Sequence, residues 1–137
     1  MYLIKTYIDK SPIDGMGAFA GEKIKKGQVV WRFEPELDRF ITKAQFYKYP
    51  KVIQDHIRKC GVIPEGSTDY ILGIDNDSFV NHSDEPNLIG DSSKSYEVSI
   101  PLVACRDVAI GEELTQNYYE YNSKDHVEYL LSHFKSK

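Results

Sequence analysis

The apolar residues of this chain fall in short runs that turn-forming residues separate. Four such runs are residues 28–33, 70–74, 79–80 and 97–106, each lying close to Gly, Pro, Asn, Asp or Ser. Runs of this length between turn residues are typical of strands in a mostly β fold. Residues 2–8 alternate apolar and polar side chains and predict a further strand, ended by a turn-rich segment. Pro101 should confine the middle of the last run to a sheet edge or a bulge.

Helical signals occur in the middle of the chain. Thr42 predicts the cap of a short helix. Pro50 suits the first turn of a second helix, which should run to Cys60 and stop at Gly61. We therefore expect a helical insert at about residues 42–60.

The C-terminal segment carries an apolar stripe with the spacing of one helix face. The stripe consists of Val127, Leu130, Leu131 and Phe134, at positions i, i+3, i+4 and i+7. Asn122 or Ser123 can cap this helix. A stripe of this kind packs on another element, so the helix should lie against the rest of the fold.

One pattern occurs twice. The spacing of Ala20, Ile24, Gly27 and Val30 equals that of Ala104, Val108, Gly111 and Leu114. Both pieces predict a strand, a turn and a second strand, in which the glycine is free to adopt a positive φ. This is a recurring hairpin-like unit, not a tandem repeat.

Length and charge limit the function classes. A chain of 137 residues fits one domain, and its net charge of -4 argues against a surface made to neutralise phosphates, so we expect no direct nucleic-acid partner. No apolar stretch is long enough for a membrane span. Cys60 and Cys105 are interpreted as free thiols in a reducing compartment. We expect a soluble, intracellular protein, cytoplasmic or nuclear.

The polar segment after residue 74 does not match a metal site. Asp75 and Asp77 have the spacing of the first two ligands of an EF-hand loop, but Phe79 and Val80 occupy the positions of the third ligand and the required glycine. His82 has no second histidine or cysteine at zinc-ligand spacing. A hydrolase that uses Cys60 or Cys105 has no local signature either. We expect no metal.

Three further motifs follow one another along the chain. They are GMG at residues 15–17, FVNHSDEPN at 79–87 and GEELTQNY at 111–118. Taken alone, the first is a tight turn, the second holds a structural histidine, and the third begins a tyrosine cluster that packs with wet hydroxyls. An aromatic cage around a cation is the functional alternative for that cluster. Sequence spacing alone leaves these alternatives open.

Together, in this order and with the repeated unit, the motifs resemble the SET domain family of S-adenosylmethionine-dependent protein lysine methyltransferases. The similarity spans about residues 4–121. The resemblance implies a mostly β fold of small curved sheets with short helices. It also implies a pseudoknot, in which the C-terminal segment threads under a loop and joins the second and third motifs.

The resemblance also implies site residues. Asn81 and His82 would contact the methyl donor, and the main chain of Met16 and Gly17 would hold its methionine end. Tyr118 occupies the position of the catalytic tyrosine and would contact the donor as well. The residues expected at the substrate channel are Tyr70, Gln116, Tyr119 and Tyr121. The cofactor would be S-adenosylmethionine, with S-adenosylhomocysteine as product and no metal.

Some features depart from the family pattern. Gln116 stands where many relatives carry an aromatic residue that is thought to set the number of methyl groups added, so the degree of methylation stays open. No cysteine cluster follows Tyr121, so a zinc-bound cap is missing. We therefore expect a SET domain at residues 1–121, with a helix in 122–137 that either closes the lysine channel or packs only for stability. Tyr119, Tyr121 or Tyr129 could form the channel wall.

The expected activity is transfer of a methyl group to the side-chain amine of lysine in a protein, a histone being one possibility. The substrate would expose a lysine, and a homodimer could complete its groove. The alternative is a non-catalytic module of the same fold that binds S-adenosylmethionine or a lysine-containing peptide.

Overall fold

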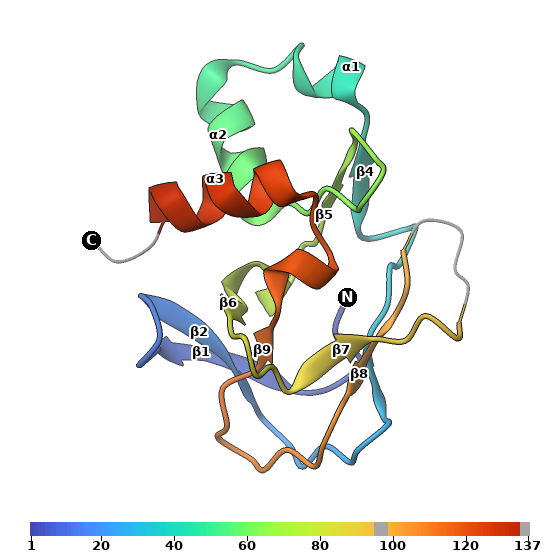
Figure 1. The fold of residues 1–137 in the computed structure, drawn as a ribbon, viewed down its shortest axis with the longest axis vertical. Coiled ribbons are helices and arrows are strands. Elements are labelled where there is room, and N and C mark those ends of the chain that lie inside the picture. The colour runs from blue at the N-terminus through green and yellow to red at the C-terminus, as the bar shows by residue number, and fades with distance from the viewer. Residues whose placement is uncertain (95–98, 135–137) are drawn as a thin grey trace.

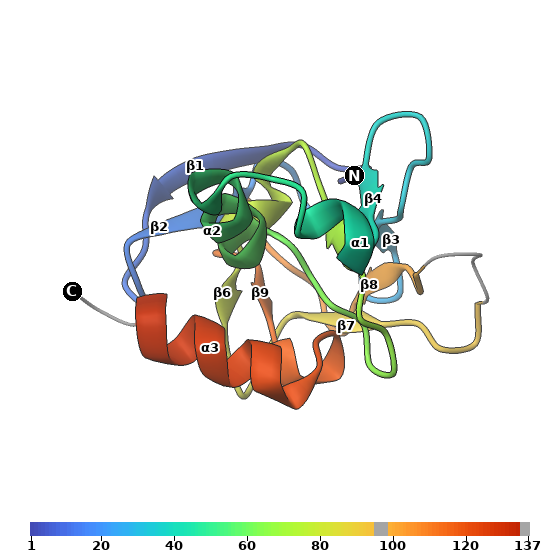
Figure 2. The same ribbon diagram turned by 90° about the horizontal axis from the view of Figure 1, so that it is seen from above.

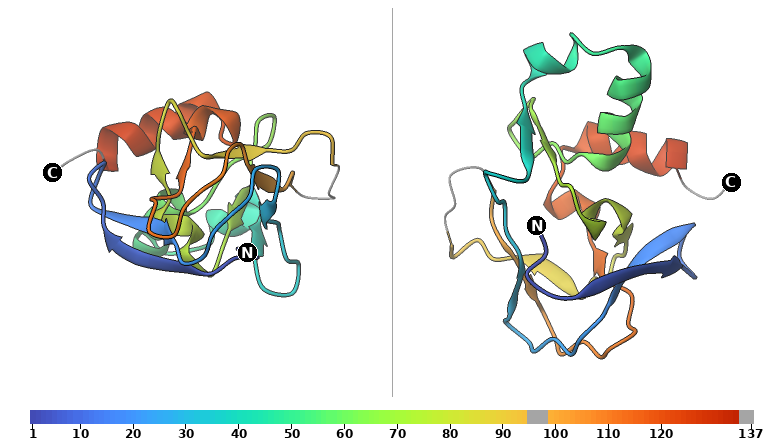
Figure 3. Two further views of the ribbon diagram at one scale, coloured as in Figure 1. Left: turned by 90° about the horizontal axis from the view of Figure 1, so that it is seen from below. Right: turned by 180° about the vertical axis from the view of Figure 1, so that it is seen from behind.

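The computed structural model describes residues 1–94 and 99–134. Figure 1 shows the helices gathered at one end of the molecule and most of the sheet structure at the other, and the view from behind in Figure 3 shows the same division. The strands are β1 (Thr6–Lys10), β2 (Met16–Ala20), β3 (Val29–Trp31), β4 (Arg39–Ile41), β5 (Tyr70–Leu72), β6 (Asn81–His82), β7 (Leu88–Gly90), β8 (Leu102–Ala104) and β9 (Thr115–Gln116). The helices are α1 (Lys43–Phe46), α2 (Lys51–Cys60), α3 (Lys124–Phe134) and the 3-10 helices η1 (Asn76–Phe79) and η2 (Tyr118–Glu120).

The strands form small separate sheets, as expected. β1 pairs with β2 and β4 pairs with β5, both antiparallel. The largest sheet of the described chain has the order β3-β8-β7-β9-β6. Its apolar side chains form the main core, in which Val30, Leu88 and Leu114 are fully buried.

The N-terminal strand lies further along the chain than predicted. A strand was expected at residues 2–8, whereas β1 covers Thr6–Lys10. The chain bends at Leu3 and Ile4, where the Leu3 N–H donates to Val30 O at 2.8 Å and Ile4 enters the core. Tyr2 forms an isolated bridge with Trp31. The alternating pattern therefore contributes to two sheets, because the first residues pair with β3 and the later ones with β2.

Two other strand predictions need correction. Residues 79–80 do not form a strand: Phe79 ends η1, and the strand β6 starts only at Asn81. The predicted strand at 97–106 is confirmed only as β8, and its residues 97 and 98 lie outside the described part of the chain. Pro101 comes immediately before β8, which pairs on both sides, so of the two predicted alternatives the edge position is wrong. An irregularity does occur next to it, because the pairing of β8 with β3 shifts register between Val29 and Trp31.

The predicted helices are confirmed. Thr42 caps α1 with a capping box, in which its hydroxyl accepts from the Gln45 N–H and the Gln45 side chain accepts from the Thr42 N–H. Pro50 precedes α2 and Gly61 follows it. The helix α3 packs against α2 and buries Val127. Figure 2 shows α3 lengthwise and α2 nearly end-on, so the axes of the two helices cross. None of these described helices is long and apolar enough to cross a membrane.

The two copies of the repeated pattern, residues 20–30 and 104–114, are hydrogen-bonded to each other almost symmetrically. We call them the paired unit. Ile24 and Val108 exchange both backbone hydrogen bonds, each at 2.9 Å. The Gly27 N–H donates to Ala104 O at 2.7 Å, and the Gly111 N–H donates to Ala20 O at 2.8 Å. Gly27 has a φ of 83° and Gly111 a φ of 86°, which confirms the predicted positive values.

The predicted pseudoknot is confirmed by the position of β9. This strand lies between β6 and β7 and runs parallel to both, with Thr115 opposite Asn81 and Gln116 opposite His82 and Leu88. Residues 83–87 connect β6 to β7 and therefore pass around β9. Asn87 stabilises this crossing with two hydrogen bonds. Its side-chain oxygen accepts from the Thr115 backbone N–H at 2.9 Å, and its backbone N–H donates to Thr115 Oγ1 at 3.2 Å.

Candidate active site

The start of β2 lies against a carboxylate that comes from the far end of the chain. A Cβ atom at Gly17 would lie 2.8 Å from Glu113 Cδ, so only glycine leaves room for this carboxylate. The Ser11 hydroxyl donates to Glu113 Oε1 at 2.7 Å. The glycine-containing turn, the first of the three motifs, is therefore joined directly to the third.

Asn81 connects the second motif to the same place. Its side-chain amide donates to Glu113 Oε1 at 2.8 Å, to Asp14 O at 3.0 Å and to Met16 O at 3.3 Å. Because β6 pairs with β9, the Asn81 side chain is held beside the turn before β2. The structure thus brings Met16, Gly17 and Asn81 together, as predicted for a common site.

The hydrogen bonds of His82 set its tautomer. The Tyr118 N–H donates to His82 Nδ1 at 3.1 Å, so a neutral ring carries its hydrogen on Nε2. Nε2 lies 3.2 Å from Asp84 Oδ1, a carboxylate that is exposed to solvent. The centroid of the imidazole lies 5.2 Å from that of the Tyr118 ring and 5.9 Å from that of the Tyr119 ring.

The Tyr118 side chain points back to the residue before Asn81. Its hydroxyl donates to Val80 O at 2.5 Å. Burial raises the pKa of Tyr118 to about 12, and the negative charges of Asp14 and Glu113 add to the shift. The phenol therefore stays protonated at neutral pH and acts as a hydrogen-bonding group.

A cleft of about 360 Å³ has Gln116, the partner of His82 in the pairing of β6 with β9, in its lining, but none of Gly17, Asn81, His82 and Tyr118. Its lining includes Gln116 from β9, Tyr121 after η2 and Trp31 from β3. Gly90 packs against two of the lining residues, because a side chain there would collide with Ile100 and press on the Tyr121 ring. Burial raises the pKa of the Tyr121 phenol, and the nearby Glu120 carboxylate raises it further. The cleft therefore has mainly apolar and aromatic walls, into which polar side chains are set, among them those of Gln116 and Asp77.

Two residues predicted for the substrate channel lie elsewhere. Tyr70 packs between Phe46, at a ring-centroid distance of 5.0 Å, and His126, at 5.6 Å. It lines a second cavity of about 380 Å³, shared with Tyr129 from α3. Tyr119 is half exposed next to His82. Of the predicted channel residues, only Gln116 and Tyr121 line the first cleft.

The helix α3 also lines the second cavity and not the first. Its residues there are Asp125, His126 and Tyr129, and the lining of the first cleft ends at Tyr121. The side-chain amide oxygen of Asn122 accepts from the Ile63 N–H at 3.1 Å and fixes the start of this helix. Closure of the channel by α3 stays a prediction.

Sequence reasoning missed Glu113 and Val80 as members of the site. Glu113 belongs to the quoted motif GEELTQNY, but one glutamate among many gives no signal of its own. Its closeness to Gly17 emerges only when β9 is in place. Among residues 1–94 and 99–134, no cluster of three or more His, Cys, Asp or Glu side chains could hold a metal ion.

The threaded strand between β6 and β7, together with the histidine and tyrosine that it joins, defines a SET-type domain. Comparison with known families agrees, because residues 15–119 match the SET domain. The chain therefore belongs to the SET domain family.

Several known proteins are similar to it. The chain is 30% identical over 131 residues to the variant-silencing SET domain-containing protein of Plasmodium falciparum (isolate 3D7). That match covers 84% of this chain but 5% of the relative, so the chain corresponds to a small part of that protein's length.

Two solved structures share the fold. One is a candidate histone methyltransferase of Plasmodium falciparum, with a TM-score of 0.58 and 24% identity over 84% of this chain and 93% of that one. The other belongs to the Polycomb Repressive Complex 2 of Chaetomium thermophilum, with a TM-score of 0.64 and 20% identity over 94% of this chain and 17% of that one.

Proposed function

We propose that the protein transfers a methyl group from S-adenosylmethionine to the side-chain amine of a lysine in a protein substrate. The observation that carries this proposal is the convergence of three distant motifs on one site, where Asn81 bonds to Met16 O and the Tyr118 N–H bonds to His82. The similar structures, among them a candidate histone methyltransferase, support a methyltransferase in general terms. A histone is one possible substrate.

The residues present fit a donor that carries a positive sulfonium. Asp14 and Glu113 place negative charge near the half-buried Tyr118, and such a region favours a cation. The main chain of Met16 and Gly17, with Asn81 and His82, would hold the donor. When bound, S-adenosylmethionine supplies an electrophilic methyl group and becomes S-adenosylhomocysteine.

The lysine must lose a proton before it can react. With a reference pKa near 10.4, this costs about 4 kcal/mol at neutral pH. Transfer of an ammonium group from water to apolar surroundings lowers its pKa, since desolvation disfavours the charged form. The walls of the cleft around Gln116 and Tyr121 offer such surroundings.

Tyr118 would orient the neutral amine. Its hydroxyl hydrogen is already donated to Val80 O, so the lone pairs of the phenol oxygen are left to accept an N–H of the amine. The lone pair of the amine nitrogen then stays free for the methyl group. Alignment of this kind recovers the entropy that two freely moving reactants would lose.

The roles of the remaining predicted residues are part of the proposal. Gln116 and Tyr121 would line the lysine channel, and Gln116 would influence how many methyl groups are added. Tyr70 and Tyr119 would have to act from outside the first cleft. A homodimer and the separate C-terminal unit at residues 122–137 also stay predictions, and full activity of a chain truncated after Tyr121 would exclude closure by α3.

The second candidate is a non-catalytic module that binds the donor or a peptide, and it is favoured only by the unusual Gln116. Incubation with labelled S-adenosylmethionine and a set of lysine-rich proteins separates the two. We expect label on at least one protein, lost when its lysines are blocked by acetylation. Saturable donor binding without transfer to any protein in the set would support the module instead.

A further inference from the structure

The second cavity takes no part in the proposed function. Its volume of about 380 Å³ is within the usual range of ligand pockets. The helices α1, α2 and α3, the strand β5 and the loop before β5 contribute to its wall. Its aromatic lining residues are Phe46, Tyr47, Tyr70, His126 and Tyr129.

The segment after α2 separates this cavity from the first cleft. Val62 and Pro64 line the first cleft, whereas Ile63 lines the second cavity. Side chains alternate in this way along an extended chain. After η2 the same change of side occurs, from Tyr121 in the first cleft to Ser123 in the second cavity. A ligand of the second cavity therefore does not occupy the proposed lysine channel.

Aromatic rings form one wall of the second cavity. The rings of Phe46 and Tyr70 are stacked, with centroids 5.0 Å apart and planes at 25°. His126 packs edge-on against Tyr70 at 5.6 Å. Tyr47 packs edge-on against Phe46 at 5.2 Å and is 62% exposed, so it lies towards the solvent. Such a wall suits an aromatic ring of a ligand, because stacked and edge-on ring pairs are both favourable.

A guanidinium group is held against this wall. The Arg58 Cζ atom lies 5.0 Å from the centroid of the Phe46 ring. Its Nη1 atom contacts Asp55 Oδ1 at 3.4 Å, which is long for a hydrogen bond. A guanidinium carries five N–H donors in a planar fork, and this long contact involves only one of its nitrogens. Arg58 can therefore bind an oxyanion in the cavity without leaving its place.

Positive charge exceeds negative charge in the lining. Its cations are Arg58 and Lys43, and its acid is the exposed Asp125. Burial lowers the pKa of His126, the hydrogen bond to Gly61 O raises it, and the charge of Arg58 lowers it again. The net shift is downward, so this imidazole is neutral at neutral pH. The lining thus favours an anion.

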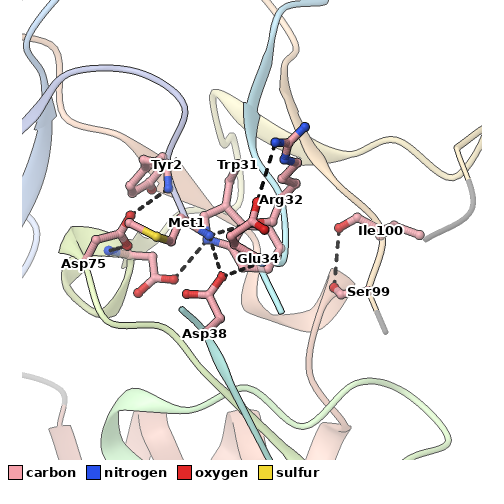
Figure 4. Close-up of polar contacts among 10 residues, drawn as sticks. Met1, Tyr2, Trp31, Arg32, Glu34, Asp38, Asp75, Ser99 and Ile100 are labelled. Carbon is pink, nitrogen blue, oxygen red and sulfur yellow. Dashed lines mark hydrogen bonds and ion pairs between the residues drawn. The ribbon is translucent and has the colours of Figure 1, made fainter. Parts of the chain in front are cut away.

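The first cleft has the opposite charge. Its charged lining residues are Asp77, Glu65 and Glu120. Asp77 accepts a hydrogen bond from Trp31 Nε1 at 3.0 Å. Figure 4 shows two further acids near Trp31, Asp38 and Asp75, close to Met1. An anion should therefore avoid the first cleft and bind in the second cavity.

We propose that the second cavity binds an aryl phosphate, namely the side chain of a phosphotyrosine residue in a partner protein. The phenyl ring would pack on Phe46 and Tyr70, and the phosphate would pair with Arg58 and Lys43. A phosphotyrosine carries a charge of about −1.5 to −2 at pH 7, which two cations match better than they match a single carboxylate. This site goes beyond the proposed transferase activity and does not depend on it.

The first test compares small probes on the wild-type protein. The probes are phenyl phosphate, benzoate, benzyl alcohol and inorganic phosphate. Calorimetry gives the affinities, and the ¹H–¹⁵N signals of the Ser67 and Thr68 backbone amides report binding in the cavity. We expect phenyl phosphate to bind at least about tenfold more tightly than the other three, because only it uses both the rings and the cations.

The indole signal of Trp31 serves as internal control. Trp31 is the only tryptophan of the chain and lines the first cleft, so its signal should not move. Equal affinities for phenyl phosphate and inorganic phosphate would show an adventitious ion only and overturn the proposal. A shift of the Trp31 signal without shifts at Ser67 and Thr68 would overturn it too.

Substitution of Arg58 tests the phosphate contact. Arg58→Gln should weaken phenyl phosphate binding at least about tenfold, since a charge-assisted hydrogen bond is lost. Arg58→Lys keeps the charge without the planar fork and should restore part of the affinity. Arg39→Gln, an exposed arginine outside the lining, is the control and should have no effect. Equal affinities of the wild type and Arg58→Gln would overturn the proposal.

Two exposed residues test the sign of the charge without disturbing the core. Lys43→Gln should weaken phenyl phosphate binding about threefold, and Asp125→Asn should strengthen it by a similar factor. Lys48→Gln and Glu128→Gln are matched controls outside the lining and should leave the affinity unchanged. Changes in the same direction for Lys43→Gln and Asp125→Asn would contradict a site for an anion.

Peptides then test the partner. One peptide is used with tyrosine, phosphotyrosine or phosphoserine at the same position, and AMP represents a nucleotide. Only the phosphotyrosine form should bind with at least the affinity of phenyl phosphate. Equal binding of AMP or of the phosphoserine form would overturn the assignment to phosphotyrosine.

A competition experiment separates this site from the proposed donor site. S-adenosylhomocysteine should not displace phenyl phosphate, and Tyr118→Phe should bind the probe like the wild type. The phosphate site and the proposed transferase activity can therefore fail independently. Displacement by S-adenosylhomocysteine would assign the cavity to the methyl donor and overturn the proposal.

Discussion

The two halves of the paired unit have matching backbone contacts but different surroundings. The first half continues into β3, at the edge of the largest sheet, and the second continues into β9, which lies between β6 and β7. Corresponding positions therefore differ in role. Val29 is a strand residue of β3, whereas its counterpart Glu113 holds Ser11 and Asn81. The same local structure thus occurs twice in the fold. The first copy supplies a strand of the largest sheet, and the second supplies a residue of the candidate site.

The largest effect is expected where the second half leads into the site. If the proposed function holds, Tyr118→Phe should lower kcat at least about a hundredfold, because the hydroxyl proposed to orient the amine is lost. Donor affinity, measured by calorimetry, should change little. Tyr119→Phe, a half-exposed neighbour, serves as control and should retain most of the rate. An unchanged rate in Tyr118→Phe with intact donor binding would remove Tyr118 from the mechanism.

Thr115→Val tests the crossing of β9. Valine keeps the shape of threonine but removes Oγ1, which leaves the buried Asn87 N–H without its acceptor. We expect the free energy of unfolding in urea to fall by about 2 kcal/mol. The exposed Thr68→Val should cost less than about 0.5 kcal/mol. Similar losses for the two variants would mean that this contact does not secure the crossing.

Glu113→Gln tests the functional difference between the two halves. Glutamine retains one acceptor oxygen but no charge, so it should hold Ser11 and Asn81 less firmly. Donor affinity should fall about tenfold, in line with a weakened hydrogen bond to a charged group. The adjacent Glu112→Gln, whose carboxylate pairs with Arg106, should leave donor affinity unchanged. Equal effects of both variants would show that Glu113 has no special role.

The smallest expected losses of stability should be equal in the two halves of the paired unit. Gly27→Ala and Gly111→Ala each force a side chain into a positive φ, at a cost of about 1 kcal/mol. No atom crowds a Cβ at Gly27, and the nearest at Gly111, Tyr7 Oη, is 3.7 Å away, so backbone strain dominates in both. Thermal unfolding should give nearly the same loss for the two variants. A clearly larger loss at one glycine would contradict the symmetry of the unit.

Local signals predicted the helices and the repeated turns well. The cap at Thr42, the stop at Gly61 and the positive φ of Gly27 and Gly111 depend on a few neighbouring residues, which the sequence displays. The pseudoknot could be expected only from the resemblance, because no local pattern states that β9 lies between β6 and β7.

The remaining differences have tertiary causes. Tyr70 follows a loop like many other strand residues, and only the packing of Phe46 and His126 around it excludes it from the first cleft. Asp77 belongs to a segment that suggested calcium, but its environment comes from Trp31 and Gly73, which are distant or unremarkable in sequence. Such positions become recognisable only after the sheets are assembled.

The central position of β9 also has a consequence for biosynthesis. While a ribosome is still adding residues before Thr115, β6 and β7 have no partner between them, and Glu113 has not yet reached Gly17. Contacts between segments so far apart in sequence form slowly. A nascent chain of this protein should therefore lack the proposed donor site until its last strand has been inserted.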